Sequence, residues 1–371
     1  MSTLMMIVLF VFAFGVMIFM HELGHFLMAK IFKVEVEEFG FGLPPRMVKL
    51  FTLGGTDFTL NWLPFGAFVK PKGEFGETDS DGGFKSAKPW QQLLIYLAGP
   101  VMNLLTAMVI YYILIMNAGV PNHSIVIIDK VEPGSPAEIA GILKGDRILS
   151  IGGNTVDAFR VVTDTVDQYL DKPLSLEVER DARKLRLEVI PLSNPPAGRG
   201  AMGIVVKYPI EKYNVISGLG AAAKTTGTMI QQYLNGLGLM ISGKIKMGMD
   251  SIVGPVGMFS IYEDMVDYDR EIAEQRQQQE ATGQVQDENL PMNGFNQLSF
   301  FAIIAIALGV TNLFPIPALD GGRILFLLPE FLFRKKLPEK VEYYYNAIGM
   351  MILLILMAVI MFKDIFMLAN G

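Results

Sequence analysis

The sequence predicts a multi-span α-helical membrane protein with four transmembrane helices, a membrane-associated β-loop and an extracytoplasmic domain of mixed α+β structure. The composition is the first reason: the 371 residues are 51% hydrophobic and 18% charged, against about 25% charged residues in soluble proteins. The second is the length of the apolar runs, which is close to the roughly 20 residues that a helix needs to cross a bilayer. Four such runs occur, at 4–20, 93–116, 298–316 and 347–368.

The first apolar run is expected to stay in the mature protein as a helix. A secretory signal peptide, the alternative for an N-terminal run, would carry a basic segment before it and a small-residue cleavage site after it. No Lys or Arg precedes Lys30, and bulky residues continue directly into His21.

The basic residues of the connections predict the orientation. Lys and Arg favour the cytoplasmic side of short loops, whereas long domains cross largely regardless of charge. Both termini and the long region 118–296 are therefore expected outside the cytoplasm. The residues that predict this are Lys30, Lys33, Arg46, Lys49, Lys70, Lys72, Lys85 and Lys88 in the first connection, and Arg323, Arg334, Lys335, Lys336 and Lys340 in the last.

The long external region divides by its patterning. Residues 120–207 are expected to form short strands between Gly and Pro turns, at 124–131, 147–151, 174–180, 185–190 and 202–206. Helices are expected at 136–140, capped by Ser135, and at 158–170. Residues 215–258 are amphipathic and are expected along the membrane surface, and 263–290 form a solvated helix or a disordered spacer. The expected segments are 1–33 (first transmembrane helix), 34–92 (cytoplasmic-side β-hairpin region), 93–117 (second helix), 118–210 (folded domain), 211–297 (amphipathic segment and spacer), 298–322 (third helix), 323–345 (cytoplasmic loop) and 346–369 (fourth helix).

Composition also limits the chemistry. With 31 basic and 37 acidic residues the net charge is −6, which indicates no nucleic-acid partner. The absence of cysteine excludes disulfides, a thiol nucleophile and cysteine-ligated metal sites. There are three histidines, His21, His25 and His123. Serine hydrolysis is disfavoured, because a serine–histidine dyad would have to use one of these three.

The candidate catalytic motif is His21-Glu22-Leu23-Gly24-His25 at the end of the first apolar run. A spacing of four places both imidazoles on one helix face, where each can bind one cation, and Glu22 can hold the water that the metal polarises. The alternative is a polar cluster that meets interfacial water. Three such side chains cost several kcal/mol in lipid, which favours a functional role.

A catalytic zinc usually has three protein ligands, and Asp320 is the candidate for the third. It ends the third apolar segment, where two prolines and two glycines break the helix; such a break is tolerated at membrane depth only around a cavity. Both segments enter from outside, and His21 and Asp320 lie about 26 and 33 Å along them at 1.5 Å per residue, so all three ligands reach similar depths. The alternative is a helix-capping or turn residue before Arg323.

These motifs resemble the site-2 protease family, and more closely its bacterial sigma-E type. The resemblance covers nearly the whole chain and implies an intramembrane zinc metalloprotease with a PDZ domain between its second and third transmembrane helices. It implies His21, His25 and Asp320 as zinc ligands, Glu22 as general base and Asn312 as a group that positions substrate or stabilises the tetrahedral intermediate. The matching segments are the HExxH motif, 98–103 (AGPVMN), 254–257 (GPVG), which we expect to form a rigid turn, and 312–322 (NLFPIPALDGG).

Residues 34–70 are expected to form a β-loop that handles substrate. Four strands, at 34–41, 47–52, 57–62 and 67–70, are separated by Pro and Gly turns. A sheet edge beside the metal would bind an unwound transmembrane segment as an added strand, and the family has a membrane-embedded β-loop at this position. The alternative is a cytoplasmic hairpin with a purely structural purpose.

Residues 131–153 (VEPGSPAEIAGILKGDRILSIGG) resemble a PDZ domain of the bacterial protease type. The chain has space for one such domain, where the sigma-E type has two, and the expected carboxylate-binding loop, 121–127, has no glycine-rich turn. A filter that excludes bulky ectodomains is therefore favoured over a receptor for a substrate's periplasmic tail. His123 is expected to be a solvated loop residue.

The sequence favours a zinc endopeptidase of the bacterial inner membrane that cleaves single-pass transmembrane proteins within the bilayer, near its cytoplasmic side. Anti-sigma factors and remnant signal peptides are the substrate classes that the resemblance implies. One alternative is a PDZ-bearing membrane scaffold with a structural metal. A divalent-metal transporter is the other, but it would need several acidic or histidine sites along a path, and the sequence shows one cluster.

Overall fold

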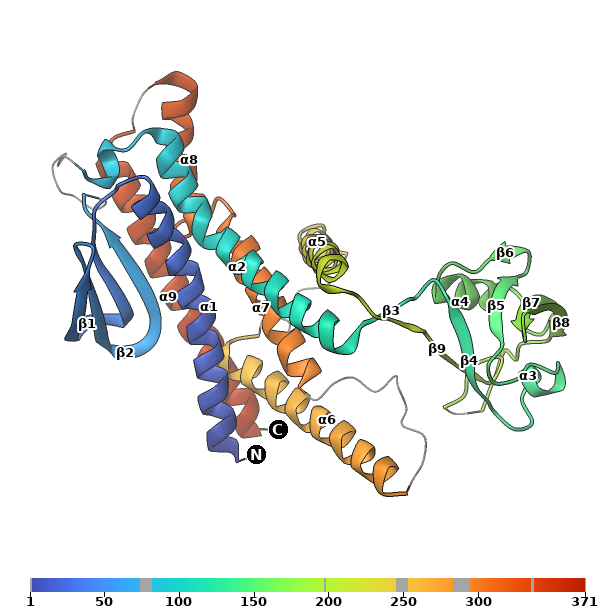
Figure 1. The fold of residues 1–371 in the computed structure, drawn as a ribbon. Helices are drawn as coiled ribbons and strands as arrows, with labels where there is room; N and C mark the ends of the chain where they lie inside the picture. The colour runs from blue at the N-terminus through green and yellow to red at the C-terminus, as the bar shows by residue number, and fades with distance from the viewer. Residues whose placement is uncertain are drawn as a thin grey trace. The chain divides into compact units, whose positions relative to one another are not determined.

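The computed structural model describes residues 2–73, 82–196, 198–244, 253–282, 294–334 and 337–370 (Figure 1). The chain divides into two compact units, each described here by itself. The first unit comprises Met1–Leu114, Ser217–Gln275 and Asn293–Gly371, and the second comprises Ile115–Ile216 and Arg276–Met292.

Four helices are long and apolar enough to cross a membrane, which confirms that part of the predicted fold. They are α1 (Thr3–Ile31), α2 (Pro89–Ala118), α7 (Phe295–Asn312) and α9 (Glu339–Asn370), whose apolar span is Lys340–Met367. Within the first unit they run alongside one another (Figure 1). The predicted third segment, 298–322, corresponds to α7, a loop and the first turn of α8 (Asp320–Phe333).

Helices α1 and α2 touch through their backbones. A Cβ atom at Gly24 of α1 would lie 2.3 Å from the Ala98 carbonyl oxygen of α2, so a side chain at residue 24 would force the helices apart. Small residues at such crossings let membrane helices approach closely. The Gly of the HExxH motif is therefore what brings α2 against the histidines. A one-turn 3₁₀ helix, η1 (Phe84–Ser86), precedes α2.

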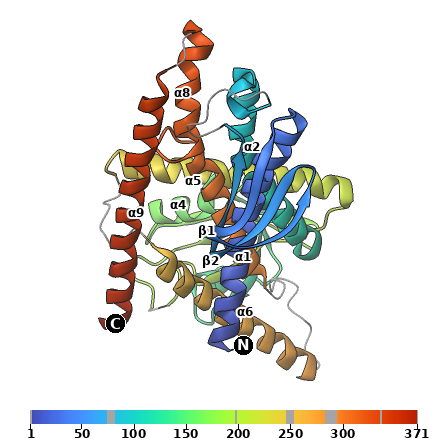
Figure 2. The same cartoon turned by 90° about the vertical axis from the view of Figure 1, so that its left-hand side faces the viewer.

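The β-loop consists of two long antiparallel strands, β1 (Val36–Leu53) and β2 (Thr56–Pro71). Both strands bend, so that Phe39 in the first half of β1 lies opposite both Phe58 and Val69 of β2. The four predicted strands are thus the halves of two continuous ones. The order across the sheet is 46–53, 56–61, 36–43 and 67–71, and the last of these is an edge strand that packs beside α1 (Figure 2).

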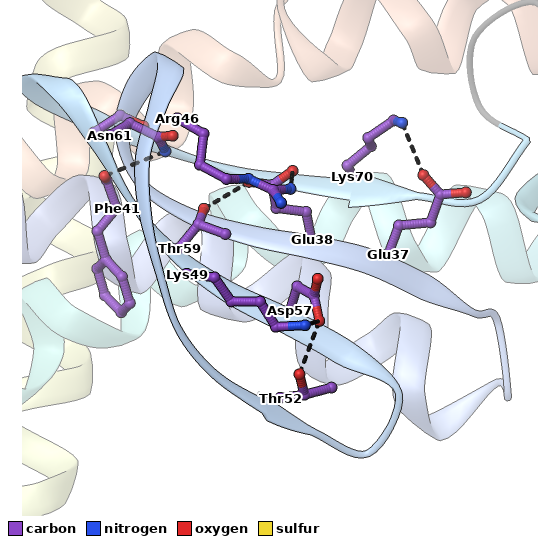
Figure 3. Close-up of polar contacts among 11 residues, drawn as sticks. Glu37, Glu38, Phe41, Arg46, Lys49, Thr52, Asp57, Thr59, Asn61 and Lys70 are labelled. Carbon is purple, nitrogen blue, oxygen red and sulfur yellow. Dashed lines mark hydrogen bonds and ion pairs between the residues drawn. The ribbon is translucent and has the colours of Figure 1, made fainter.

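Polar pairs fix the register of this sheet (Figure 3). The Arg46 guanidinium donates to Glu38, with 3.0 Å between Nε and Oε1, and the Thr59 hydroxyl donates to the same oxygen at 2.6 Å. Although partial burial raises the pKa of the Glu38 carboxyl, these bonds outweigh it and hold that pKa below its usual value. Lys49 and Asp57 form a second pair, 2.6 Å between Nζ and Oδ1.

Helix α6 (Pro255–Thr282) is tied to two other helices by buried aspartates. Asp364 of α9 accepts from the Gly257 backbone N–H at 2.9 Å, and Asp269 of α6 accepts from Asn296 and Gln297 at the start of α7. Carboxylates are stabilising at helix N-termini. The predicted 254–257 turn is therefore the start of a helix docked on α9. The expected spacer, 263–290, is helical to Thr282, and 283–290 lies outside the described residues.

Helix α5 (Val215–Ile241) crosses the direction of α7 (Figures 1 and 2). The hydroxyls of Tyr233 and Thr311 share a hydrogen bond of 2.9 Å. Thr311 lies about 24 Å along α7 from Phe295, at 1.5 Å per residue. The contact packs α5 against the end of α7, and the position of this helix along the membrane surface stays a prediction.

The second unit is built on a sheet with strand order β8-β7-β5-β4-β9, to which β6 adds at β5. Its core is a cluster of buried hydrophobic side chains, mainly Val, Ile and Leu. Ser135 caps α3, as predicted. The elements are β4 (Val126–Val131), α3 (Pro136–Ile139), β5 (Arg147–Ile151), β6 (Asn154–Thr155), α4 (Phe159–Gln168), β7 (Leu174–Arg180), β8 (Arg183–Val189) and β9 (Ile204–Lys207), close to the predicted strands and helices, plus a ribbon of β3 (Val120–Pro121) and β10 (Ile210–Glu211).

Candidate metal centre

His21, His25 and Asp320 meet inside the first unit. Asp320 Oδ2 lies 3.1 Å from His21 Nε2 and 3.4 Å from His25 Nε2, and the two Nε2 atoms are 3.1 Å apart. The three side chains are 11–12% exposed. Among the described residues they form the one group of His, Asp and Glu side chains that could hold a metal ion.

The local sequence explains how each of the three side chains reaches this point. His21 and His25 are four residues apart on α1 and share a face. Asp320 begins α8, just after α7 has ended and the chain has turned at 313–319. That turn needs the two glycines that follow Asp320, because Cβ atoms at Gly321 and Gly322 would lie 2.2–2.4 Å from backbone carbonyl oxygens of the loop.

Helix α2 forms the wall behind the imidazoles. The Ile95 carbonyl lies 2.7 Å from His25 Nδ1, and Asn103 Nδ2 lies 3.3 Å from His21 Nδ1. Between them, a Cβ at Gly99 would lie 2.3 Å from His25 Nε2. Ile95, Gly99 and Asn103 are spaced by four, like the two histidines, so one face of α2 matches one face of α1.

Glu22 faces the β-loop from the same stretch of α1. Its Oε2 accepts a hydrogen bond of 3.0 Å from the Val69 backbone N–H, in the edge strand of the sheet. A cavity of about 530 Å³ adjoins this contact, and its lining includes Glu22, Val69 and the three residues of the metal group. Asn312 lines the cavity too, at the end of α7.

The donor set fits a tetrahedral zinc ion. Ligand atoms at zinc bond lengths of about 2.0–2.2 Å lie about 3.3–3.6 Å from one another, close to the observed 3.1–3.4 Å. Asp320 Oδ2 is buried and has no hydrogen-bond partner, although it lies near both imidazoles. A carbonyl oxygen can only accept, so the proton of His25 belongs on Nδ1, facing Ile95, which leaves the Nε2 lone pair for a metal.

The structure brings together all five residues that the sequence singled out, but sequence reasoning missed their supports. Segment 98–103 was identified only by its resemblance to the family, and no role was predicted for Gly99 or Asn103. An Asn in the mostly apolar middle of the second predicted helix was the available signal, because polar groups in membrane helices are costly. His123 belongs to the second unit, where it is exposed and its ring packs on Tyr208 at 4.5 Å between centroids.

Comparison with known proteins agrees with this site. The model of peptidase family M50 matches residues 9–356. The chain belongs to peptidase family M50. The family is that of the site-2 proteases, which the motifs resemble, and its members are peptidases.

Similar proteins of this family extend over nearly the whole chain. A protein predicted to be a zinc metalloprotease in Clostridium perfringens (strain 13 / Type A) is 32% identical over 365 residues, covering 97% of this chain and 98% of the relative. The zinc metalloprotease RasP of Bacillus licheniformis and the regulator of sigma-W protease RasP of Bacillus subtilis (strain 168) are each 27% identical over 440 residues, covering 97% of this chain and 98% of each relative.

We predict that Gly99→Ala weakens metal binding without unfolding the protein. The added methyl would overlap His25 Nε2, and overpacking of this kind costs about 1–3 kcal/mol, or about five- to 150-fold in affinity. Zinc affinity of the detergent-solubilised chain, measured by competition with a chelator, checks this.

Gly15→Ala is the matched control, because a Cβ at residue 15 of α1 meets nothing within 4 Å. Unchanged zinc affinity in Gly99→Ala would contradict the close approach of α2 to the imidazoles.

Proposed function

We propose that this chain is an intramembrane zinc endopeptidase that cleaves single-pass transmembrane proteins in or near the bilayer. The observation that carries the proposal is the convergence on one cavity of Glu22 and three side chains that could hold a metal ion, among helices able to span a membrane. The relatives named zinc metalloproteases support zinc as the metal.

Each polar residue of the cavity has a proposed role. His21, His25 and Asp320 would hold the zinc, which when bound would polarise a water molecule and lower its pKa toward about 7. Glu22 accepts the proton of that water at its carboxylate and passes it to the leaving amine. Asn312, at the end of α7, orients the scissile carbonyl or stabilises its oxygen as negative charge develops there.

Substrate binding is proposed at the edge strand 67–71. A helical substrate must be unwound before cleavage, and its backbone groups then need new partners. The Val69 N–H points toward Glu22 and so does not pair with β1. An extended substrate added at this edge would run directly past the base and the metal group.

The substrates are proposed to be anti-sigma factors or remnant signal peptides. The name of the Bacillus subtilis relative, regulator of sigma-W protease, supports the first class for that protein. For this chain the support is chemical: the cavity lies among apolar helices, and a single transmembrane segment is the peptide that enters such a site laterally.

The second unit is proposed to be a PDZ domain outside the cytoplasm that excludes bulky ectodomains. The segment expected to hold a peptide carboxylate is occupied by contacts within the unit: β3 pairs with β10, the Asn122 amide donates to Glu211 at 2.6 Å, and the Asn122 backbone N–H donates to Pro209. These contacts favour the filter over a receptor for a substrate's periplasmic tail.

We predict that Glu22→Gln abolishes cleavage and retains zinc, whereas Asp320→Ala loses zinc. A general base contributes about 10²–10⁴ to the rate, and Asp320 supplies one of three ligands. Cleavage of a single-pass reporter and metal analysis of the purified chain are the two measurements, with Asp267→Ala, at an exposed helical site, as control.

Full cleavage by Glu22→Gln would remove Glu22 as the base and favour the alternative, a scaffold with a structural metal. Unchanged zinc content in Asp320→Ala would remove Asp320 as a ligand.

We predict that Val69→Pro slows cleavage more than Val69→Ala. Proline removes the N–H that faces the site while leaving the pairing with β1 intact, and one hydrogen bond is worth about 0.5–1.5 kcal/mol, or about two- to tenfold. Initial cleavage rates at low reporter concentration test this, and equal rates for the two variants would argue against strand addition here.

The proposed orientation predicts that Ser193→Cys reacts with an impermeant thiol reagent in intact spheroplasts. The natural chain has no cysteine, so each single variant reports one position. Ser86→Cys, in the first connection, is the matched control and should react only after the spheroplasts are permeabilised. The reverse pattern would invert the topology.

A further inference from the structure

Asn103 is a buried amide in the middle of α2. It is 1% exposed, and its Nδ2 lies 3.3 Å from His21 Nδ1 while its Oδ1 is buried without a hydrogen-bond partner. A polar group in an apolar helix is costly, and an unsatisfied buried oxygen adds to that cost. The side chain therefore needs a reason to be there.

A reason emerges when the groups of α2 that face Nδ1 of the two histidines are compared. His25 Nδ1 faces the Ile95 carbonyl, which can only accept, so His25 carries its proton on Nδ1 and presents the Nε2 lone pair. His21 Nδ1 faces Asn103, eight residues further along the same face of α2. For His21 Nε2 to bind a metal as well, its proton must also be on Nδ1, and the facing group must accept.

The Asn103 amide can supply that acceptor. Its oxygen and nitrogen ends have nearly the same shape, so a half-turn of the amide exchanges them without displacing other atoms. Oδ1 would then accept from His21 Nδ1–H, and Nδ2 would take the buried position that Oδ1 now occupies. Hydrogen bonds of this kind fix the tautomer and the ring orientation of metal-binding histidines.

We propose that Asn103 is a positioning residue that holds His21 in its metal-binding tautomer by accepting a hydrogen bond from Nδ1–H. The proposal rests on the proposed role of His21 as a zinc ligand. It assigns α2 a defined part in the site: a backbone carbonyl orients one histidine and a side-chain amide orients the other. Loss of such a partner typically costs about ten- to hundredfold in metal affinity.

Two variants of nearly the same size test it. Asn103→Asp presents only oxygens and keeps the acceptor, whereas Asn103→Leu keeps the volume and offers neither donor nor acceptor. We expect Asn103→Leu to weaken zinc binding about ten- to hundredfold and Asn103→Asp to bind zinc at least as tightly as the natural chain. Zinc affinity of the full chain in detergent, measured by chelator competition, is the readout.

The controls separate this inference from the proposed function. Thr106→Val removes another polar side chain of α2, one that donates within its own helix, and should leave zinc affinity unchanged. Asn103→Ala also lacks the acceptor and cannot clash, so it should weaken zinc binding even if Leu at this position disturbs folding.

Wild-type zinc affinity in both Asn103→Leu and Asn103→Ala would overturn the inference, and so would equal weakening in Asn103→Asp and Asn103→Leu. Either of these results would leave the proposed function standing, provided that Asp320→Ala abolishes zinc binding in the same assay. Absence of zinc binding in the natural chain would instead defeat the proposed function itself.

Discussion

The structure depends on holding three polar side chains at one point within an apolar bundle. His21, His25 and Asp320 converge within 3.4 Å of one another, and their desolvation is compensated when they share a cation. Much of the surrounding architecture serves this convergence. Gly24 lets α1 and α2 touch, Gly99 leaves room for the imidazoles, and the broken chain after α7 delivers Asp320.

The sequence predicted the parts governed by local pattern. Four apolar runs became helices because their length and composition allow little else, and in the second unit β5 and β7 match their predicted ranges because turns and alternation bound them. Asp320 was predicted from the helix-breaking residues around it and from its depth along the segment, which the rise per residue makes calculable.

The parts that were missed depend on contacts between distant segments. Nothing in the sequence around Asn103 or Val69 indicates that one faces His21 and the other Glu22. Periodicity finds the faces of an element but not the neighbour of each face. The halved strands of the β-loop illustrate this, because turn residues at 44–45 and 64–66 predicted interruptions where the chain bends and keeps pairing.

The two aspartates that hold α6 have a consequence for how this protein tolerates sequence change. Asp364 accepts from the Gly257 backbone N–H, and Asp269 accepts from the backbone N–H groups of Asn296 and Gln297 and, at 2.7 Å, from the Asn296 amide. The backbone N–H is a donor that every residue except proline provides. Both contacts nevertheless restrict replacement on the receiving side as well, because Asn296 contributes its side chain and a Cβ at Gly254 would lie 2.6 Å from Asp364 Oδ2. Exposed side chains of α6 that make neither contact carry no such restriction, so substitutions there should leave the docking of α6 on α7 and α9 unchanged.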